Sequence, residues 1–479
     1  MVITKSLAQG VIKWEWLVML LLIPVFLFSD NYQVYLLVII PLFWVLRIIA
    51  TGRFFQATPL DLTILLFLSM IAVSFIVTFD ASLSLPKISV ILLGVGLFYS
   101  SVHFSQSHPK KNWYVLVFVL GSGTLMAMIS LISADWQPPF SFLNQMRTML
   151  PEWVPALPGT HGGVVNANEV AGTLNWIAPL MLACLIGMSK RLWTNHKVLL
   201  FGLVIGSVVT TFTLLATLSR GGILGFAIGL AVIMALYMQP RWRLVLAVGM
   251  VVMALAFFFS YQNPQTGNDA FDDAMGLESR IELWERGVLV VSDFPLTGIS
   301  INGYRRVVHT LYPLYSIAPE TDVAHAHNHL LQTAVDLGLP GLIIYLAIWL
   351  ICGGMLYRSW RRLVNQNRID GIHYALVAGL SGSLIAGWIF GTFDAVALGS
   401  RPTFIWWLLL GLVVSTHQEV CFRDNKKPRT IDYPSPAETS EVNKRQTPRG
   451  PTIPPTGMDA KTKAVSAATI QPVEIESSE

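Results

Sequence analysis

Long hydrophobic runs, separated by short polar connections, dominate the first 416 residues of the chain. A run of about 18 apolar residues is long enough to cross the hydrocarbon core of a membrane as a helix. The first run is expected to be a retained helix, because no small-residue cleavage site follows it. The pattern predicts twelve membrane spans, at about 14–29, 34–50, 60–79, 86–105, 113–133, 169–188, 198–218, 222–239, 243–260, 330–357, 373–395 and 402–416.

The composition agrees with a protein whose main solvent is lipid. Charged residues make up 13% of the chain, against about a quarter in soluble domains, and hydrophobic residues make up 53%. The net charge is only +4 and no basic groove with interleaved aromatic residues occurs, so a nucleic-acid partner is not expected. Cys184, Cys352 and Cys421 lie in apolar runs or in the tail, which implies neither a disulfide nor a cysteine-based zinc site.

Lysine and arginine are distributed unequally between the two sets of connections. The short connections of one set carry only Lys87, Arg220 and Arg401. Because positive residues accumulate on the cytoplasmic side, both termini are expected in the cytoplasm, which agrees with an even number of spans. The rich set contains Lys5, Lys13, Arg47, Arg53, Lys110, Lys111, Lys190, Arg191, Lys197, Arg241, Arg243, Arg358, Arg361, Arg362 and Arg368.

Two long segments, 134–168 and 261–329, are then expected outside the cytoplasm. The second lies between the ninth and tenth spans and ends in a histidine cluster. From residue 417 the chain is rich in proline, threonine, serine and charge, a composition that cannot bury enough apolar surface to fold. The sequence therefore predicts an all-α polytopic membrane domain over 1–416, with its motifs in 198–357, and a disordered cytoplasmic tail over 417–479.

Arg220 is an isolated cation in the stretch "LSRGG", on the side where positive charge is depleted. It could extend from a helix end to the lipid headgroups. It could instead hold an anionic substrate, with Gly221 and Gly222 allowing close approach of the backbone. The side of the membrane favours the second interpretation.

Arg280 lies in "ESRIELWERGVLVV", which predicts an amphipathic helix. Ser279 and Glu282 match a capping box, which would place Arg280 in the first helical turn. A cation is unfavourable there, so a bound anion would compensate, unless an ordinary ion pair does. The candidate ion-pair partners are Glu278, Glu282 and Asp293. The arginines of this segment expected to be solvated are Arg286, Arg305 and Arg306.

Three histidines, His325, His327 and His329, alternate just before a long hydrophobic run. Their spacing puts all three on one face of a strand, or His325 and His329 together on a helix. They could bind zinc, with Glu320 or Asp322 completing the ligands. One neutral histidine could act as a base, since its pKa lies near ambient pH, which is the favoured interpretation. A purely structural histidine at the start of the helix is the third possibility.

Three stretches, in this order, resemble the O-antigen ligase and O-antigen polymerase superfamily: "SRGG" at 219–222, "SRIELW" at 279–284 and "HNHLLQTAVDLGLPG" at 327–341. The last fits the pattern His-[Asn/Ser/Gln]-x9-Gly-x-x-Gly, which assigns His327, Asn328, Gly338 and Gly341. The twelve-span layout with a long outward loop also resembles that family. His325 and His329 depart from the pattern.

The resemblance implies a metal-independent membrane glycosyltransferase of the C type, without a cofactor, in the bacterial cytoplasmic membrane. It would transfer a glycan from an undecaprenyl-pyrophosphate donor to an acceptor hydroxyl at the outer face. The acceptor would be lipid A-core, as in lipopolysaccharide synthesis, a growing polysaccharide or a protein. His327 would be the base, and Arg220 and Arg280 would bind the pyrophosphate.

Alternatives remain within and outside this enzyme class. An O-antigen or polysaccharide polymerase and a protein O-oligosaccharyltransferase differ from a ligase only in the acceptor, which no motif specifies. A lipid-linked glycan transporter would also place arginines near an anionic headgroup. Transporters usually build their site at the membrane midplane from broken helices or repeats. The unusual residues here gather at one face, which favours the enzyme, and we expect a ligase.

Overall fold

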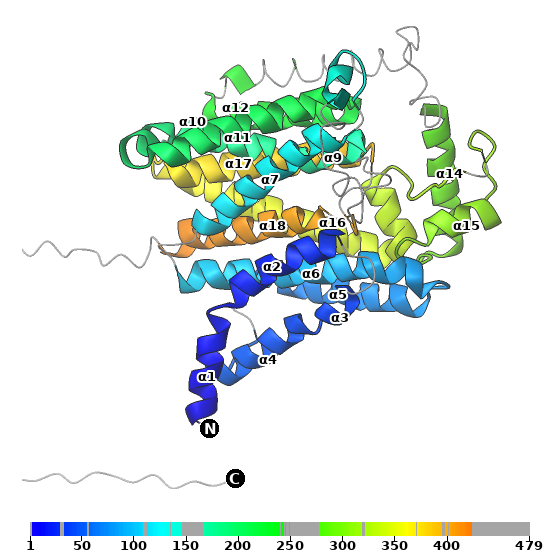
Figure 1. Cartoon of the computed structure of the whole chain (residues 1–479), viewed down its shortest axis with the longest axis horizontal. Coiled ribbons are helices and arrows are strands. Elements are labelled where there is room, and N and C mark those ends of the chain that lie inside the picture. The colour runs from blue at the N-terminus through cyan, green and yellow to red at the C-terminus, as the bar shows by residue number, and fades with distance from the viewer. Residues whose placement is uncertain are drawn as a thin grey trace, which may run out of the picture. The chain divides into compact units, whose positions relative to one another are not determined.

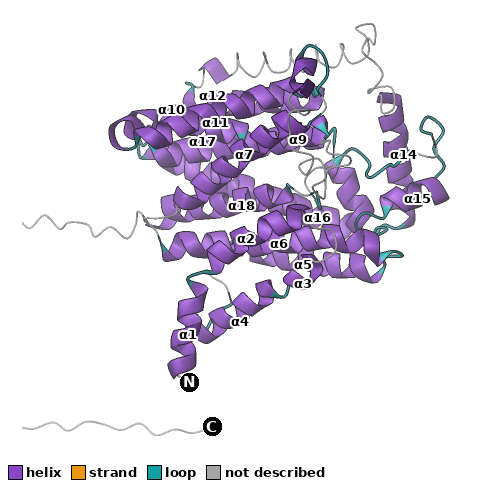
Figure 2. Ribbon diagram, in the orientation of Figure 1, coloured by secondary structure: helices purple, strands orange, loops and turns teal. Residues whose placement is uncertain are grey.

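In the computed structural model, all regular secondary structure of the described residues is helical (Figure 1), and Figure 2 shows no strand among them. Most of these helices are apolar and long enough to cross a membrane. The predicted fold class, an all-α polytopic membrane protein, is confirmed. The structure describes residues 2–28, 33–54, 57–108, 113–134, 136–145, 166–239, 241–243, 245, 249, 277–318, 321–369, 371–394, 398–400 and 402–423.

Nine helical segments of the described residues meet the length and hydropathy expected of a membrane span. The first predicted span corresponds to a bent pair, Lys5–Ile12 with Glu15–Phe26, whose axes differ by 50°. The third corresponds to α5 (Asp61–Ile76), an apolar helix of 16 residues. The ninth predicted span, 243–260, lies almost wholly outside the described residues.

The bent pair belongs to α1 (Val2–Ile12) and α2 (Glu15–Phe28). The nine segments are α3 with α4 (Gln33–Leu36, Ile39–Thr51), α6 (Ala81–Ser107), α7 (Trp113–Ser133), α9 with α10 (Ala167–Asn175, Ala178–Asn195), α11 (Lys197–Ala216), α12 (Arg220–Tyr237), α16 (His329–Asn365), α17 (Ile372–Gly391) and α18 with η3 (Thr403–Gln418, Glu419–Arg423). The remaining described helices are η1 (Phe140–Leu143), α14 (Leu277–Asp293) and α15 (Tyr304–Leu311).

The end of the helical region differs from the predicted boundary at residue 416. Helical structure continues through α18 and η3 to Arg423. His417 is buried there and its Nδ1 lies 3.0 Å from Oγ of Ser359 in α16, so packing against α16 extends the helix into the polar sequence. The predicted tail beyond residue 423 lies outside the described residues.

Glycines let the spans approach closely. A Cβ on Gly225 of α12 would lie 2.6 Å from the carbonyl oxygen of Ala386 in α17, and one on Gly94 of α6 would overlap the Trp407 ring of α18. Small residues at helix contacts are how membrane helices usually associate, because they allow dense van der Waals packing. Accordingly α12 packs along α17, and α6 packs along α18 (Figure 1).

Arg47 departs from the predicted charge pattern of the cytoplasmic side. Arg47 was predicted in a connection but lies inside α4, 2% exposed, where its Nε is 2.7 Å from Oε2 of Glu15 and its Nη2 pairs with Oε1. A buried cation needs such a partner, because leaving water unpaired would cost several kcal/mol. Glu15 therefore neutralises Arg47. The unequal distribution of positive charge between the two sets of connections then depends on the other lysines and arginines.

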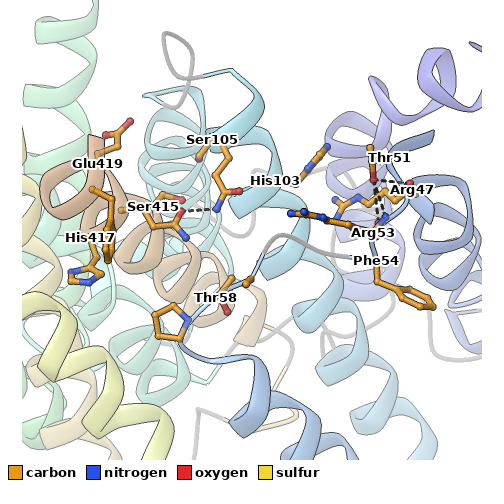
Figure 3. A pocket seen from close by; sticks show the side chains of 15 residues that line it. Arg47, Thr51, Arg53, Phe54, Thr58, His103, Ser105, Ser415, His417 and Glu419 are labelled. Atoms are coloured by element: carbon orange, nitrogen blue, oxygen red, sulfur yellow. Dashed lines mark hydrogen bonds between the residues drawn. The ribbon is translucent and has the colours of Figure 1, made fainter. Parts of the chain in front are cut away.

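A cavity of about 1140 Å³ opens at one end of α6 and α18 (Figure 3). Its lining includes His103 of α6, His417 of α18 and Arg53, which follows α4. Lys87 lies near the opposite end of α6, roughly 25 Å away at 1.5 Å per helical residue. The residues predicted to do chemistry gather at that opposite end, so this cavity is not part of their site.

Candidate active site

Two of the three histidines converge on one carboxylate. Nδ1 of His327 lies 3.5 Å from Oδ1 of Asp394, and Nε2 of His325 lies 3.6 Å from the same oxygen. The two imidazole centroids are 4.3 Å apart. Asp394 follows α17 and is 5% exposed, so its carboxylate is held in the interior of this end of the bundle. The sequence did not predict Asp394, because nothing local marks it.

The loop before α16 holds His327 in an unusual backbone conformation. Its φ is +46°, in the left-handed region that few residues other than glycine adopt. The His327 N–H donates to Nδ1 of His325, 3.3 Å away, which supports this turn. The strain is local to the residue that the family motif assigns as the base, and such strain persists only where its surroundings fix it.

Asn328 caps α16 and connects it to the turn that carries Asp394. Its Oδ1 accepts hydrogen bonds from the N–H groups of Leu330 and Leu331, both at 3.0 Å. Its Nδ2 donates to the carbonyl oxygen of Thr392 at 3.2 Å. Asn328 therefore uses both its amide oxygen and its amide nitrogen, and it links the segment that bears His327 to the segment that bears Asp394.

His329 has a structural role in this arrangement. It is 3% exposed, its Nδ1 lies 2.9 Å from the hydroxyl of Tyr345, and its ring packs edge-on against Trp388 at 4.8 Å. The prediction that His329 could share a helical face with His325 is wrong, because His329 starts the helix and points into the bundle. The aromatic cluster consists of His329, Tyr345, Trp349, Trp388 and Trp406.

The two motif glycines belong to a break in α16. Gly338 has φ +70° and ψ 178°, so the element is two helices joined at a kink. A Cβ on Gly338 would lie 2.6 Å from the carbonyl oxygen of Leu296, and one on Gly341 would lie 2.2 Å from Cβ of Leu337. The amide freed at Leu339 donates instead to the carbonyl of Pro295 at 2.7 Å. The close approach of the segment after α14 thus requires Gly338, whereas Gly341 is required by the side chain of Leu337 within α16.

Arg220 is the first residue of α12 and is exposed. Ser219 caps the helix, its Oγ accepting the N–H of Gly222 at 3.2 Å. A Cβ on Gly221 would be 3.3 Å from Cβ of Phe393, the residue before Asp394. The structure therefore brings the start of α12 beside the turn that carries Asp394.

Arg280 lies within α14 and is half-buried. Gly287, two turns further along, is on the same side of the helix, and a Cβ there would be 2.8 Å from Leu331 of α16. Arg280 is therefore on the side of α14 that packs against α16, near the start of α14. Figure 1 shows α14 and α15 together at one end of the bundle.

The predicted capping box is wrong. The helix is already formed at Leu277, so Ser279 lies inside it. The Glu282 carboxylate accepts hydrogen bonds from the N–H groups of Tyr315 and Ser316, at 2.6 and 2.8 Å, and from the Ser316 hydroxyl. Burial alone would raise the pKa of Glu282, but these hydrogen bonds outweigh it and hold the pKa below its usual value.

Two arginines expected to be solvated are instead paired. Nε of Arg286 donates to the carbonyl of Pro313 at 3.0 Å. Nε of Arg305 lies 2.8 Å from Oδ1 of Asp322. Asp322, one of the two predicted zinc ligands, thus pairs with Arg305, and the histidines lie against Asp394. Glu320, the other predicted ligand, lies outside the described residues.

Burial sets the protonation of His325. It lowers the pKa of the imidazole to about 3, while the nearby Asp394 carboxylate opposes this shift. His325 is consequently neutral across the physiological range. Its lone pair is on Nδ1, which accepts the N–H of His327, so Nε2 carries the ring proton and a metal ion that binds at Nε2 would displace that proton. His325 is a possible metal ligand, as are His327 and Asp394, because one donor atom of each lies within 4.8 Å of the others.

Lys87 is a second residue that the sequence did not predict to lie near the histidines. It lies in the first turns of α6, half-buried, with its side-chain stem against Gly399. Asp336, Glu169 and Asp322 are the carboxylates that interact with it electrostatically, and it acts in turn on His325. Ionisable residues inside membrane helices are rare and usually functional, which was the available signal.

The described residues form an all-helical bundle of candidate membrane spans, which is the architecture of a multi-pass membrane protein, and a histidine–carboxylate pair lies at one end of it. Residues 205–346 match the family described as O-antigen ligase. This segment contains Arg220, Arg280 and His327, and the match confirms the O-antigen ligase superfamily for it. The family implies a glycosyltransferase-like enzyme acting on lipid-linked glycans in a bacterial membrane. No curated protein matches the sequence.

Proposed function

We propose that this protein transfers a glycan from an undecaprenyl-pyrophosphate-linked donor to an acceptor hydroxyl at the outer face of the cytoplasmic membrane, as an O-antigen ligase. One observation carries the proposal: His327, the motif histidine, faces Asp394, whose turn packs against the start of α12 at Arg220. The segments that carry a base and a cation are then in contact, and transfer from a pyrophosphate uses both groups. The match to the O-antigen ligase family supports the reaction class.

In this proposal Asp394 is a positioning residue. A proton on Nδ1 of His327 would face the carboxylate, which leaves the lone pair on Nε2 for the acceptor. Carboxylates hold catalytic histidines in one tautomer in this way, and they stabilise the imidazolium that forms. The separation of 3.5 Å in the free protein is longer than a good hydrogen bond, and such contacts often shorten when substrate binds.

The transfer step balances with these groups alone. The acceptor oxygen attacks the anomeric carbon of the donor sugar, and its proton passes to Nε2 of His327. The bond between that carbon and the pyrophosphate oxygen breaks, and its electron pair leaves with undecaprenyl pyrophosphate. Arg220 and Arg280 stabilise the charge that develops on the leaving group, since guanidinium groups bind phosphate oxygens in pairs. The imidazolium then returns its proton to water.

The proposal requires the end of the bundle with α14 and α15 to face outward. The test places single cysteines at exposed positions, Thr310→Cys in α15 and Thr194→Cys in the last turn of α10, after replacement of Cys184, Cys352 and Cys421. An impermeant thiol reagent added to intact cells should label the first and spare the second. The reverse labelling would exclude the mechanism.

Activity is tested with purified protein and a lipid-pyrophosphate glycan of known structure. Lipid A-core, a polysaccharide and an acceptor protein are offered separately, and mass spectrometry identifies which becomes glycosylated while release of undecaprenyl pyrophosphate is followed. A ligase should glycosylate lipid A-core. Transfer to another acceptor would replace the ligase by a polymerase or a protein glycosyltransferase, and flipping of the donor without transfer would replace it by a transporter.

A further inference from the structure

We propose that His325, His327 and Asp394 form a binding site for a divalent transition-metal cation, best fitted by Zn²⁺, and that the bound ion switches the transferase off. The binding half of this proposal stands on the geometry alone. The inhibition half rests on the proposed function, because it assumes that His327 is the base. The transfer reaction itself uses no metal in this scheme.

The distances fit zinc ligands better than hydrogen bonds. The two N···O separations, 3.5 and 3.6 Å, are long for a hydrogen bond. Ligand atoms bound tetrahedrally to Zn²⁺ at about 2.0–2.1 Å lie roughly 3.3 Å apart, close to both values. One donor atom from each of the three residues already lies within 4.8 Å of the other two, so small side-chain rotations would complete the ligand set.

A second observation concerns Nδ1 of His327. This atom is buried and makes no hydrogen bond, although it is a strong donor or acceptor. Leaving such an atom unsatisfied in the interior is unfavourable, and a metal ion is one partner that removes this cost. The atom is aimed at the Asp394 oxygen that also faces His325.

The chemistry of the donors selects the ion. Two imidazoles and one carboxylate suit Zn²⁺ and related ions, whereas Mg²⁺ and Ca²⁺ prefer oxygen ligands throughout. The cations around the site have carboxylates of their own, Arg305 with Asp322 at 2.8 Å and Lys87 with Asp336 in electrostatic range. The three protein ligands leave a fourth tetrahedral position for water.

Metal binding would remove the base by changing the tautomer of His327. A metal on Nδ1 forces the ring proton onto Nε2, the nitrogen that the proposed reaction needs unprotonated. It also occupies the Asp394 oxygen that orients the ring. Zinc would therefore block proton transfer without displacing either arginine.

The decisive variant is His325→Asn. An asparagine at this position can still accept the N–H of residue 327 through its side-chain oxygen, as an Asx turn does, so the local backbone is preserved. It cannot supply the zinc-binding nitrogen. His309→Asn is the matched control, because His309 lies in the same outer segment with its Nε2 2.9 Å from the carbonyl of Thr321.

Binding is measured with purified protein that lacks cysteines and has been stripped with EDTA, by titrating Zn²⁺ against a chromophoric chelator. We expect one equivalent of Zn²⁺ to bind to the protein with all three ligands and to its His309→Asn variant. His325→Asn should lose at least about 10-fold to 100-fold in affinity, the cost of disturbing a ligand's surroundings alone. Mg²⁺ should not compete. Equal zinc affinity in His325→Asn and the control would overturn the site.

Inhibition is measured on the same preparations. Zn²⁺ should suppress transfer by the unaltered protein and by His309→Asn, and EDTA should restore it, whereas the turnover of His325→Asn should be the same in Zn²⁺ and in EDTA. Zinc bound with no effect on turnover would overturn the inhibition half. Activity that is lost when EDTA strips the protein and restored by Zn²⁺ would also overturn the inhibition half. It would at the same time contradict the assignment of His327 as a base that works without metal. Inactive protein that still binds zinc through His325 would count against the proposed function and leave the metal site established.

Discussion

The side-chain amide of Asn328 donates to the carbonyl oxygen of Thr392 across 3.2 Å. Thr392 is two residues before Asp394, and Asn328 is the residue after His327. This single hydrogen bond therefore fixes the distance between the two groups on which the proposed chemistry depends. The same asparagine caps α16, so its two functions can be separated by substitution.

Asn328→Asp keeps the two oxygen acceptors for the cap but removes the donor to Thr392. We expect near-normal thermal stability and a clear loss of kcat, because Asp394 is no longer held opposite His327. Asn328→Ala should lose the cap as well, at a cost of about 1 kcal/mol. Melting in detergent and turnover are measured for both. An aspartate variant that is as active as the unaltered protein would show that the bond to Thr392 does not matter.

His327→Ala should lower turnover by on the order of 10²–10⁴, the usual contribution of a general base. His329→Ala should behave differently, since it removes a ring from the aromatic cluster and its contact with Tyr345. We expect a stability loss on the order of 2 kcal/mol or more. Turnover per folded molecule should remain close to normal. Comparable losses of kcat in both variants, at equal folded yield, would argue against His327 as the only base.

Arg220→Ala and Arg280→Ala should each reduce turnover on the order of 10², because removing one preorganised donor from a developing charge has about this effect. Lysine at either position should restore activity only partly, since it keeps the charge but loses the planar fork. The control is Arg306→Ala, an exposed arginine of α15. Rates and KM for the lipid-linked donor are compared among variants with matched membrane insertion. A control as damaged as the two site variants would indicate a general effect of charge.

Gly338→Ala should destabilise the protein strongly, because φ is +70° there and the added Cβ would meet the Leu296 carbonyl at 2.6 Å. The backbone strain alone costs about 1–3 kcal/mol. Gly353→Ala lies on the same element α16 with open space around its Cβ, so it should be neutral or slightly stabilising. Folded yield and melting temperature test the pair. Similar values for both would mean that the kink is not needed.

The hydrogen bonds to Glu282 should make the loop at Tyr315 and Ser316 sensitive to acid. Because the folded pKa of Glu282 is lowered, its stabilising contribution is present above the unfolded value of about 4.5 and is lost as pH falls through the folded pKa. Amide exchange protection at Tyr315 and Ser316 should stay constant from pH 7 to about 5 and fall below that. Glu282→Gln should remove this pH dependence. If the protection of these amides were already lost at pH 6, the Glu282 carboxylate would not be the group that controls it.

Hydropathy alone predicted the positions of most spans, because crossing the membrane constrains about 18 successive residues to be apolar. Where local pattern competes with packing, the prediction failed. Ser279 and Glu282 have the spacing of a capping box, but the loop containing Ser316 takes the Glu282 carboxylate instead. Arg47 has the charge of a loop residue, yet Glu15 lets it sit inside a helix.

The motifs placed His327, Asn328 and Gly338 at the site, because each is tied to a local backbone feature: a left-handed turn, a helix cap and a kink. Asp394 and Lys87 could not be found in this way. Their relation to the histidines arises from the packing of α17 against α16 and from the contact of Lys87 in α6 with Gly399, which no short stretch of sequence encodes. Asp322 was the nearest acidic choice along the chain and proved to belong to Arg305.

The aromatic cluster beneath the histidine loop has a consequence for where protons can travel. His329, Tyr345, Trp349 and Trp388 pack ring against ring, with centroids 4.8–6.3 Å apart, immediately below the loop that carries His327. In the orientation proposed for this protein, the cluster would separate His327 from the cytoplasmic side, and rings packed in this way would leave little room for a chain of water. A proton taken by His327 would leave by the face at which it arrived, so the reaction would move no charge across the bilayer. Glycan transfer would then neither draw on the membrane potential nor dissipate it.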